Sequence, residues 1–276
     1  MLELQQEDVE GDSAPALAGF PRRRVVRVGS LELGGGRPGL IAGPCSVEPG
    51  YVGHALALAS VGVGGLRACV FKPRTHPNSF QGMGAAALPL LEEARQRTGL
   101  PLVSEVLSAA DAELLGDLAD AFQVGARSMQ NFRLLEALGE IGRPVLLKRG
   151  LSATVDEWIA ASEYVRRSGN DDVVLCERGI RTFETRTRNT LDLSSVLVAR
   201  ELTDLPVIVD PSHAAGHGRW VPALARAALA VGADGLLVEA HPTPAAAWTD
   251  ADQAIDLEAL GGLVEHARRS SARMEG

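Results

Sequence analysis

From residue 40 onwards, short apolar segments alternate with longer segments in which apolar residues recur at helical spacing. The short segments do not alternate with polar residues, which is typical of strands buried on both faces of a parallel sheet. There are eight of them, near residues 40–42, 66–71, 102–106, 121–124, 145–147, 173–176, 206–209 and 235–238. The helical segments include residues 85–97, 132–139, 155–167, 221–231 and, after the last strand, 253–269.

Eight consecutive strand–helix units predict a (β/α)8 TIM barrel, a fold of about 250 residues. The alternative is an open doubly wound sheet, but no Gly-x-Gly-x-x-Gly motif follows the first strand, and the strand count favours closure. Before the barrel, residues 24–36 alternate apolar and polar positions around Gly29 and Ser30, which predicts a short β-hairpin. We expect residues 1–22 to be a mobile tail and residues 23–276 to be one catalytic domain that includes the hairpin.

Composition narrows the class of protein. The 276 residues are 46% hydrophobic and 22% charged with a net charge of −8, which fits a globular protein and argues against nucleic-acid binding. The N-terminus is acidic and lacks the basic and apolar regions of a secretory signal, and no apolar stretch is long enough to span a membrane. Three widely spaced cysteines form no disulfide framework, so we expect a cytoplasmic location.

Charged and metal-ligating residues follow the predicted strands, where a TIM barrel carries its chemistry. Five cations belong to this rim: Arg67, Lys72, Arg127, Lys148 and Arg178. A cationic pocket in an acidic protein predicts an anionic substrate, most simply one with a phosphate or with a phosphate and a carboxylate.

A second set at the same rim suits a divalent metal. Cys45, His213 and Glu239 follow or end predicted strands, and Asp250 comes eleven positions after Glu239. One thiolate, one imidazole and two carboxylates suit Zn²⁺, Mn²⁺, Fe²⁺ or Co²⁺. Since only the barrel can bring these residues together, the prediction requires the sulfur of Cys45 to lie within about 6 Å of the His213 ring.

Several longer motifs stand in one order along the chain. They are I-A-G-P-C-S-V-E (41–48), F-K-P-R-T-x-P-x-S-F-Q-G (71–82), V-G-A-R (124–127), L-L-K-R-G (146–150), C-E-R-G-I-R-T-F-E (176–184), R-N-T-L-D (188–192), D-P-S-H (210–213) and V-E-A-H-P (238–242). Together they closely resemble the 3-deoxy-D-arabino-heptulosonate 7-phosphate synthases of the type I-beta branch, from about Val25 to Leu257. The resemblance implies a metal-dependent condensation of phosphoenolpyruvate with erythrose 4-phosphate, the first step of the shikimate pathway.

The resemblance also implies residue roles. Cys45, His213, Glu239 and Asp250 would bind the metal; Arg67, Lys72, Glu105, Arg127, Lys148 and Arg178 would line the phosphoenolpyruvate site; Arg74 and Thr75 would meet the aldose phosphate. Lys72, Glu105 and His213 are the expected catalytic residues. We expect neighbouring cations to lower the pKa of Lys72, so that it protonates the new alkoxide, while Glu105 orients either Lys72 or the attacking water.

Some alternatives remain. His76 and Asn78 stand where Ser and Tyr are common in the family, which leaves the aldose open. The related 3-deoxy-octulosonate 8-phosphate synthases carry a K-A-N-R-S motif instead of K-P-R-T, and a variant of secondary metabolism would keep the same residues. Other classes are a Schiff-base aldolase that uses Lys148 and a non-catalytic sensor of phosphorylated metabolites. A homo-oligomer is expected by analogy.

Overall fold

Eight parallel strands close into a barrel in the computed structural model, which describes residues 20–74 and 76–272. The strand order is β10-β3-β4-β5-β6-β7-β8-β9, so each strand pairs with its neighbours in sequence and the last pairs with the first. The strands are β3 (Gly39–Gly43), β4 (Gly65–Arg67), β5 (Leu102–Glu105), β6 (Ala121–Val124), β7 (Val145–Lys148), β8 (Val173–Glu177), β9 (Val207–Val209) and β10 (Gly235–Glu239). The predicted barrel is confirmed, and the open sheet is excluded.

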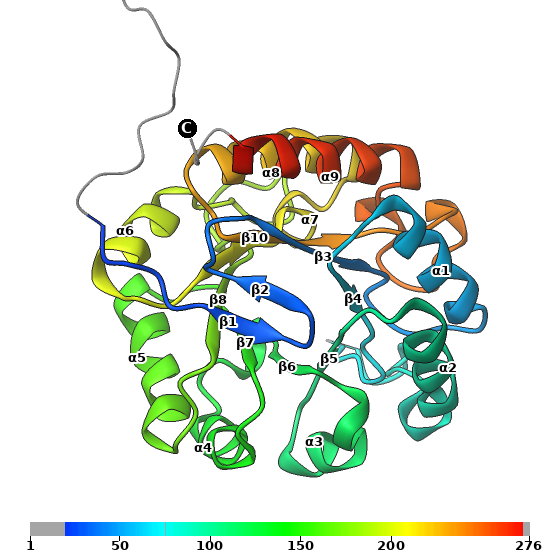
Figure 1. Ribbon diagram of the computed structural model, residues 1–276, viewed down its shortest axis with the longest axis horizontal. Coiled ribbons are helices and arrows are strands. Elements are labelled where there is room, and N and C mark those ends of the chain that lie inside the picture. The colour runs from blue at the N-terminus through cyan, green and yellow to red at the C-terminus, as the bar shows by residue number, and fades with distance from the viewer. Residues whose placement is uncertain (1–19, 75, 273–276) are drawn as a thin grey trace, which may run out of the picture.

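Helices surround the barrel on all sides (Figure 1). They are α1 (Tyr51–Val61), α2 (Leu88–Thr98), α3 (Ala109–Leu115), α4 (Phe132–Ile141), α5 (Val155–Arg167), α6 (Ser194–Leu202), α7 (Pro211–Ala215), α8 (Val221–Ala230) and α9 (Leu257–Ala272). The helix predicted over residues 155–167 is confirmed with the same bounds as α5. It begins there because Thr154 and Glu157 form a capping box,. The last helix begins four residues later than predicted, since residues 251–253 form a separate 3-10 turn, η6 (Ala251–Gln253).

The second strand is shorter than predicted. The apolar segment 66–71 continues past β4, which ends at Arg67. Ala68, Cys69 and Val70 are nevertheless fully buried, because the chain after β4 packs under the neighbouring loops: Val47 N donates to Cys69 O at 2.8 Å and Gly84 N to Val70 O at 3.0 Å. Hydrophobicity here marks a buried loop rather than a strand.

The predicted hairpin is confirmed and closes one end of the barrel. β1 (Val26–Val28) and β2 (Leu31–Leu33) pair antiparallel around a turn in which Gly29 has a φ of 55°. Its inward side chains, including Val26 and Leu33, belong to the same apolar cluster as Ile41, Leu146 and Leu237 of the barrel strands. Figure 1 shows the hairpin lying across the barrel opening. Of the predicted tail, residues 1–19 lie outside the described residues.

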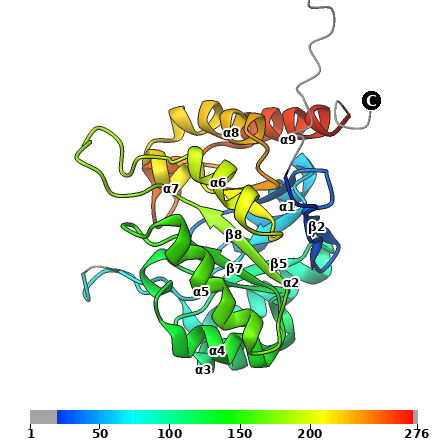
Figure 2. The same cartoon turned by 90° about the vertical axis from the view of Figure 1, so that its left-hand side faces the viewer.

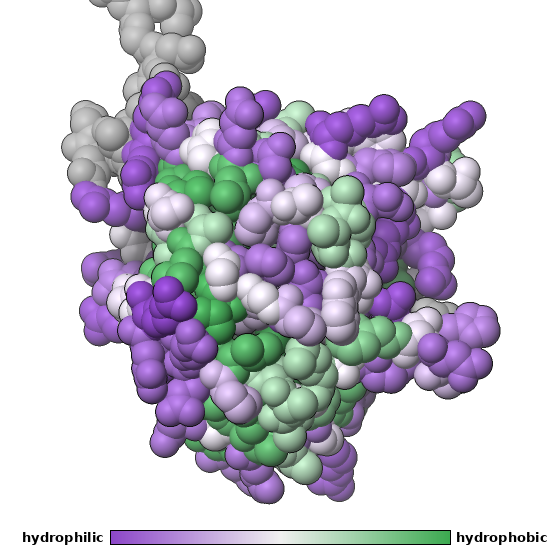
Figure 3. All heavy atoms as spheres, turned by 90° about the vertical axis from the view of Figure 1, so that its right-hand side faces the viewer, coloured by the Kyte–Doolittle hydropathy of each residue, from purple (hydrophilic) through white to green (hydrophobic). Residues whose placement is uncertain are grey.

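The two ends of the barrel are therefore different. Figure 2 shows the hairpin at one end, while the loops after β4 and β8 project from the other. The face that carries α1 and α2 is partly apolar (Figure 3), and Leu56, Ala85, Ala86 and Leu90 are exposed or half-buried there. In the described part of the chain, no helix has both the length and the apolar character that a membrane crossing requires.

Candidate active site

The site residues lie at the end of the barrel opposite the hairpin because the strands are parallel and all deliver their last residues to one rim. Arg67, Glu105, Lys148 and Glu239 are the final residues of β4, β5, β7 and β10. Cys45 lies just beyond β3. His213 belongs to α7, whose start is capped by Asp210: its carboxylate accepts from His213 N at 2.9 Å.

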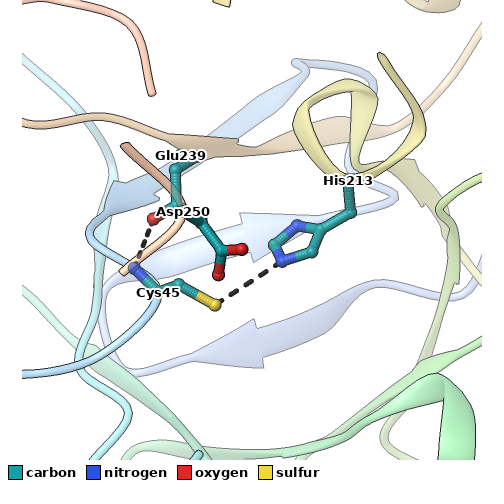
Figure 4. Close-up of side chains that lie close together, drawn as sticks. All are labelled: Cys45, His213, Glu239 and Asp250. Carbon is teal, nitrogen blue, oxygen red and sulfur yellow. Dashed lines mark hydrogen bonds between the residues drawn. The ribbon is translucent and has the colours of Figure 1, made fainter. Parts of the chain in front are cut away.

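The four predicted metal ligands converge at this rim. One donor atom from each of Cys45, His213, Glu239 and Asp250 lies within 4.8 Å of the others. Cys45 Sγ is 3.5 Å from His213 Nε2, well inside the predicted limit of about 6 Å. Figure 4 shows the four side chains pointing toward one another from separate segments of the chain. Residues spread over more than two hundred positions are thus brought together by the barrel alone.

The donor set fits a divalent transition metal. Asp210 Oδ2 lies 2.8 Å from His213 Nδ1, which leaves Nε2 facing Cys45, and this carboxylate–histidine arrangement is common behind metal ligands. Burial lowers the pKa of His213 well below its ordinary value, so the ring is neutral and able to ligate. Burial raises the pKa of the Cys45 thiol to about 12, although Arg67 opposes the shift.

Asp250, the fourth predicted ligand, is held by two cations. Lys72 Nζ donates to its Oδ2, and Arg188 Nη1 donates to Oδ1 at 3.1 Å. Burial opposes ionisation of Asp250, but Lys72, His213 and Arg188 together outweigh burial and lower the pKa of this carboxyl. The residue has a φ of 53° and is the only non-glycine with positive φ among residues 20–74 and 76–272.

The expectation that Lys72 has a lowered pKa is wrong. Burial does disfavour its charged form, but Cys45, Asp250 and Glu239 together outweigh burial and raise the pKa of Lys72. The prediction counted the neighbouring cations and did not include the acidic groups on the far side of the barrel mouth. Lys72 is therefore an ammonium group at neutral pH.

A cavity of about 290 Å³ opens beside the four ligands. Seven cations line it against two carboxylates, Glu105 and Asp250; the cations are Arg67, Lys72, Arg74, Arg127, Lys148, Arg178 and Arg188. Such an excess of positive charge at one cavity favours an anionic ligand. Arg67 Nε is buried and has no hydrogen-bond partner in the described part of the protein.

Glu105 lies in the cavity but does not contact Lys72 through a hydrogen bond. Its Oε2 accepts from Gln123 Nε2 at 2.8 Å, while Lys72 is bonded to Asp250. Burial raises the pKa of Glu105, and Lys148 partly offsets this. Two roles were expected for Glu105, and no hydrogen bond supports the one in which it orients Lys72. Thr75 lies outside the described residues, and Arg74 lines the cavity.

Three residues of the site were missed by the sequence analysis. Asp210 accepts from Lys148 Nζ at 2.6 Å and faces His213, Gln123 holds Glu105, and Arg188 joins Asp250 to Gln253. Signals for them existed. Asp210 opens the D-P-S-H motif and Arg188 the R-N-T-L-D motif, while Gln123 is a polar residue within an otherwise apolar strand.

Comparison with known proteins agrees with the motifs. The sequence profile of the DAHP synthetase I family matches residues 23–274. The chain belongs to this family. Among family members, it is 45% identical over 251 residues to the phospho-2-dehydro-3-deoxyheptonate aldolase of Thermotoga maritima, an alignment that covers 90% of this chain and 74% of that one.

Solved structures of DAHP synthases have the same fold. The crystal structure of the Thermotoga maritima DAHP synthase superposes with a TM-score of 0.86 over the same shares of both chains. A truncated form of that enzyme gives a TM-score of 0.82 at 42% identity and covers 90% of this chain and 92% of that one. A 2-dehydro-3-deoxyphosphooctonate aldolase of Syntrophotalea carbinolica is 32% identical over 274 residues, covering 91% of this chain and 97% of that protein.

Proposed function

We propose that this protein condenses phosphoenolpyruvate with erythrose 4-phosphate to give 3-deoxy-D-arabino-heptulosonate 7-phosphate and phosphate, the first step of the shikimate pathway. One observation carries the proposal: a cavity with seven cations adjoins a Cys-His-Glu-Asp cluster in a member of the DAHP synthetase I family. The higher identity to the heptonate aldolase, 45% against 32% for the octonate aldolase, favours the four-carbon aldose. The catalytic unit comprises residues 23–276.

The metal centre is part of the proposal. Cys45, His213, Glu239 and Asp250 would hold a divalent ion, and sulfur, imidazole and carboxylate donors suit Mn²⁺, Fe²⁺, Co²⁺ or Zn²⁺. When bound, the ion supplies Lewis acidity at the edge of the cavity. Because Cys45 has a raised pKa, its thiol gives up a proton when the ion binds.

The cations bind and orient the first substrate. Arg67, Lys72, Arg127, Lys148 and Arg178 surround the phosphate and carboxylate of phosphoenolpyruvate, where guanidinium groups suit bidentate contacts with oxyanions. Lys148 is fixed by its bond to Asp210 and Arg67 by its bond to Glu239. Their positions are thus set before substrate arrives, which reduces the ordering that binding requires.

The bond changes follow from this placement. C3 of phosphoenolpyruvate attacks the aldehyde carbon, a C–C bond forms, and positive charge develops at C2. Lys72 carries the proton at Nζ that the new alkoxide receives. Water adds at C2, and one of its protons replaces the one that Lys72 gave up. The C–O bond to phosphate then breaks, the second proton goes to the leaving phosphate, and C2 becomes a carbonyl. His213 serves the reaction as a metal ligand, Glu105 lies where it can orient the water, and Arg74 with Thr75 binds the phosphate of the aldose.

The remaining parts of the proposal are a homo-oligomer and a cytoplasmic location. The apolar patches on the face that carries α1 and α2 (Figure 3) and the analogy to the family support the first. Three free, buried cysteines support a reducing compartment,.

The test is to incubate the protein with Mn²⁺, phosphoenolpyruvate and either erythrose 4-phosphate or arabinose 5-phosphate, and to measure phosphate release. We expect phosphate release with phosphoenolpyruvate and erythrose 4-phosphate, and none when arabinose 5-phosphate is the aldose. Release with arabinose 5-phosphate alone would replace the proposal by the octulosonate reaction, and no release with any aldose phosphate would favour a sensor. Borohydride trapping of substrate on Lys148 would favour the Schiff-base aldolase.

A further inference from the structure

A second group of metal-type side chains lies outside the cavity. Donor atoms of Glu48, His54 and His241 are within 4.8 Å of one another. The hydrogen bonds of His241 decide what this group does. Thr243 N donates to His241 Nδ1 at 2.9 Å, so Nδ1 has the lone pair and Nε2 bears the proton. That proton points at Glu48 Oε1, 2.8 Å away. The ring therefore donates to a carboxylate and has no lone pair at Nε2 for a metal.

Glu48 instead joins, by hydrogen bonds, the segments of the chain that carry three of the proposed metal ligands, Cys45, Glu239 and Asp250. Its Oε1 accepts from His241, two residues after Glu239, and its Oε2 accepts from Trp248 N at 2.8 Å, two residues before Asp250. Glu48 itself comes three residues after Cys45 and is only 3% exposed. One buried carboxylate thus connects the loop after β3 with both ends of the segment between Glu239 and Asp250.

This segment has little regular structure to hold it. Between β10 and α9 it contains only η5 (Pro244–Ala246), the 3-10 turn η6 and an isolated bridge between Ala240 and Ile255. At its far end Asp250 adopts the left-handed conformation, which costs free energy in any residue with a Cβ. Such a conformation persists only where the surroundings fix it. Glu48 supplies a buried anchor through Trp248 N, two residues before Asp250.

We propose that Glu48 is a positioning residue that presents Asp250 to the divalent metal. This inference rests on the proposed function, because it requires the metal centre. It concerns a residue that lies outside the four-ligand set and outside the lining of the cavity. Glu48 acts through two hydrogen bonds, and the one from Trp248 N transmits its effect to Asp250.

The first experiment compares the wild-type protein with Glu48→Gln by titration with Co²⁺ alone. The glutamine has the same shape, but its amide NH₂ faces one of the two donors, so one hydrogen bond is lost. Loss of such a supporting contact weakens metal affinity by about 10–100-fold. The thiolate-to-cobalt charge-transfer band should remain at saturation, since Cys45 is unchanged. The matched control is Asp120→Asn, which removes a carboxylate that accepts from Leu102 N at 2.9 Å at the other end of the barrel; its Co²⁺ affinity should equal that of the wild type.

A double-mutant cycle separates positioning from a general effect on the fold. Asp250→Gly removes the ligand but adopts the left-handed conformation without strain. If Glu48 acts through Asp250, Glu48→Gln should lower affinity in the wild-type background and change it less than about twofold in the Asp250→Gly background. An equal loss in both backgrounds would overturn the inference.

A second pair of variants tests the same hydrogen bond without changing Glu48. Trp248→Pro deletes the N–H donor, and Ala247 already has the extended backbone, with ψ of 133°, that a residue before proline requires,. Trp248→Ala removes the ring and keeps the donor. Affinity for Co²⁺ should fall about tenfold in Trp248→Pro relative to Trp248→Ala. Equal affinities in this pair, or in wild type and Glu48→Gln, would overturn the role of Glu48 and leave the proposed metal centre unaffected. A wild-type protein that binds no Co²⁺ would overturn the proposed metal centre itself.

Discussion

Arg67 Nη1 donates a hydrogen bond to Glu239 Oε2 at 2.8 Å, and both side chains are almost completely buried. The other terminal nitrogen of the same guanidinium donates to Cys45 Sγ at 2.8 Å. One arginine thus contacts two of the proposed metal ligands and also lines the anion cavity. The proposed metal and substrate sites therefore have Arg67 in common. A change of charge in one site must alter the electrostatic potential in the other.

The first prediction concerns the stability of this buried pair. Arg67→Met leaves the Glu239 carboxylate buried without its partner, which should lower the free energy of unfolding by about 3–5 kcal/mol. Urea denaturation in the presence of a chelator measures this. Mn²⁺ should restore part of the lost stability because it supplies a new positive charge to Glu239 and binds only the folded state. An unfolding free energy equal to that of the wild type would contradict the prediction.

The second prediction follows from the bond between Lys72 and Asp250. Lys72→Met removes a cation that both occupies the Asp250 carboxylate and repels a metal ion. Affinity for Co²⁺, measured by calorimetry, should rise about tenfold, since a charge-assisted hydrogen bond is worth roughly 1.5–3 kcal/mol and 1.4 kcal/mol is one factor of ten. Condensation should be lost at the same time. Arg74→Met, which removes an exposed cation of the same cavity, should change the affinity less. An unchanged or weaker affinity in Lys72→Met would disprove the competition.

The barrel could be predicted from sequence because its strands are buried on both faces. Apolar segments such as residues 121–124 coincide with observed strands, and the capping box at Thr154 marks a helix start that needs no tertiary information. Segment 66–71 was overextended for a physical reason. Ala68–Val70 are buried under a loop, and burial alone cannot distinguish a loop from a strand.

The site was predictable only in part. Barrel topology requires that Arg67, Lys148 and Glu239 share one rim, because each ends a parallel strand. The pairing within the rim depends on loop paths, which have no periodic signal. Lys72 bonds to Asp250 rather than to Glu105 because the segment after β10 returns across the barrel mouth. The same return makes Glu48 an anchor. Its place at the end of the I-A-G-P-C-S-V-E motif marks the residue but does not indicate this role.

The third prediction uses the raised pKa of Cys45, about 12. At neutral pH the thiol is protonated, so metal binding through the thiolate must release one proton. Affinity for Mn²⁺ or Co²⁺ should therefore rise about tenfold for each pH unit between roughly pH 6 and pH 8. Cys45→Ala should bind metal weakly, release no such proton and lose activity, while its circular dichroism stays that of the wild type. A pH-sensitive dye in weak buffer measures the release.

Removal of the metal is a related test of the whole wild-type protein. Chelation should abolish phosphate release from phosphoenolpyruvate and erythrose 4-phosphate, and added Mn²⁺ should restore it, if the four ligands hold an ion that the reaction needs. The same treatment leaves a Schiff-base reaction on Lys148 active. Full activity after exhaustive chelation, or in metal-stripped Cys45→Ala, would therefore refute the metal-dependent mechanism.

The last prediction concerns His54, whose ring lies edge-on to His241 with centroids 4.3 Å apart. Burial, and then the neighbouring His241, lower the pKa of His54, while Glu48 opposes the shift. A histidine with a lowered pKa takes up its proton more readily in the unfolded chain. Its contribution to stability is therefore complete above the unfolded pKa of about 6.5 and is lost as pH falls below that value. His54→Gln has no such proton, so acidification from about pH 7.5 to pH 5.5 should destabilise it less than the wild type. Urea denaturation with chelator present measures both proteins, and their difference at the higher pH accounts for any packing that the substitution removes. Parallel losses of stability in the two proteins would show that His54 does not titrate as its surroundings indicate.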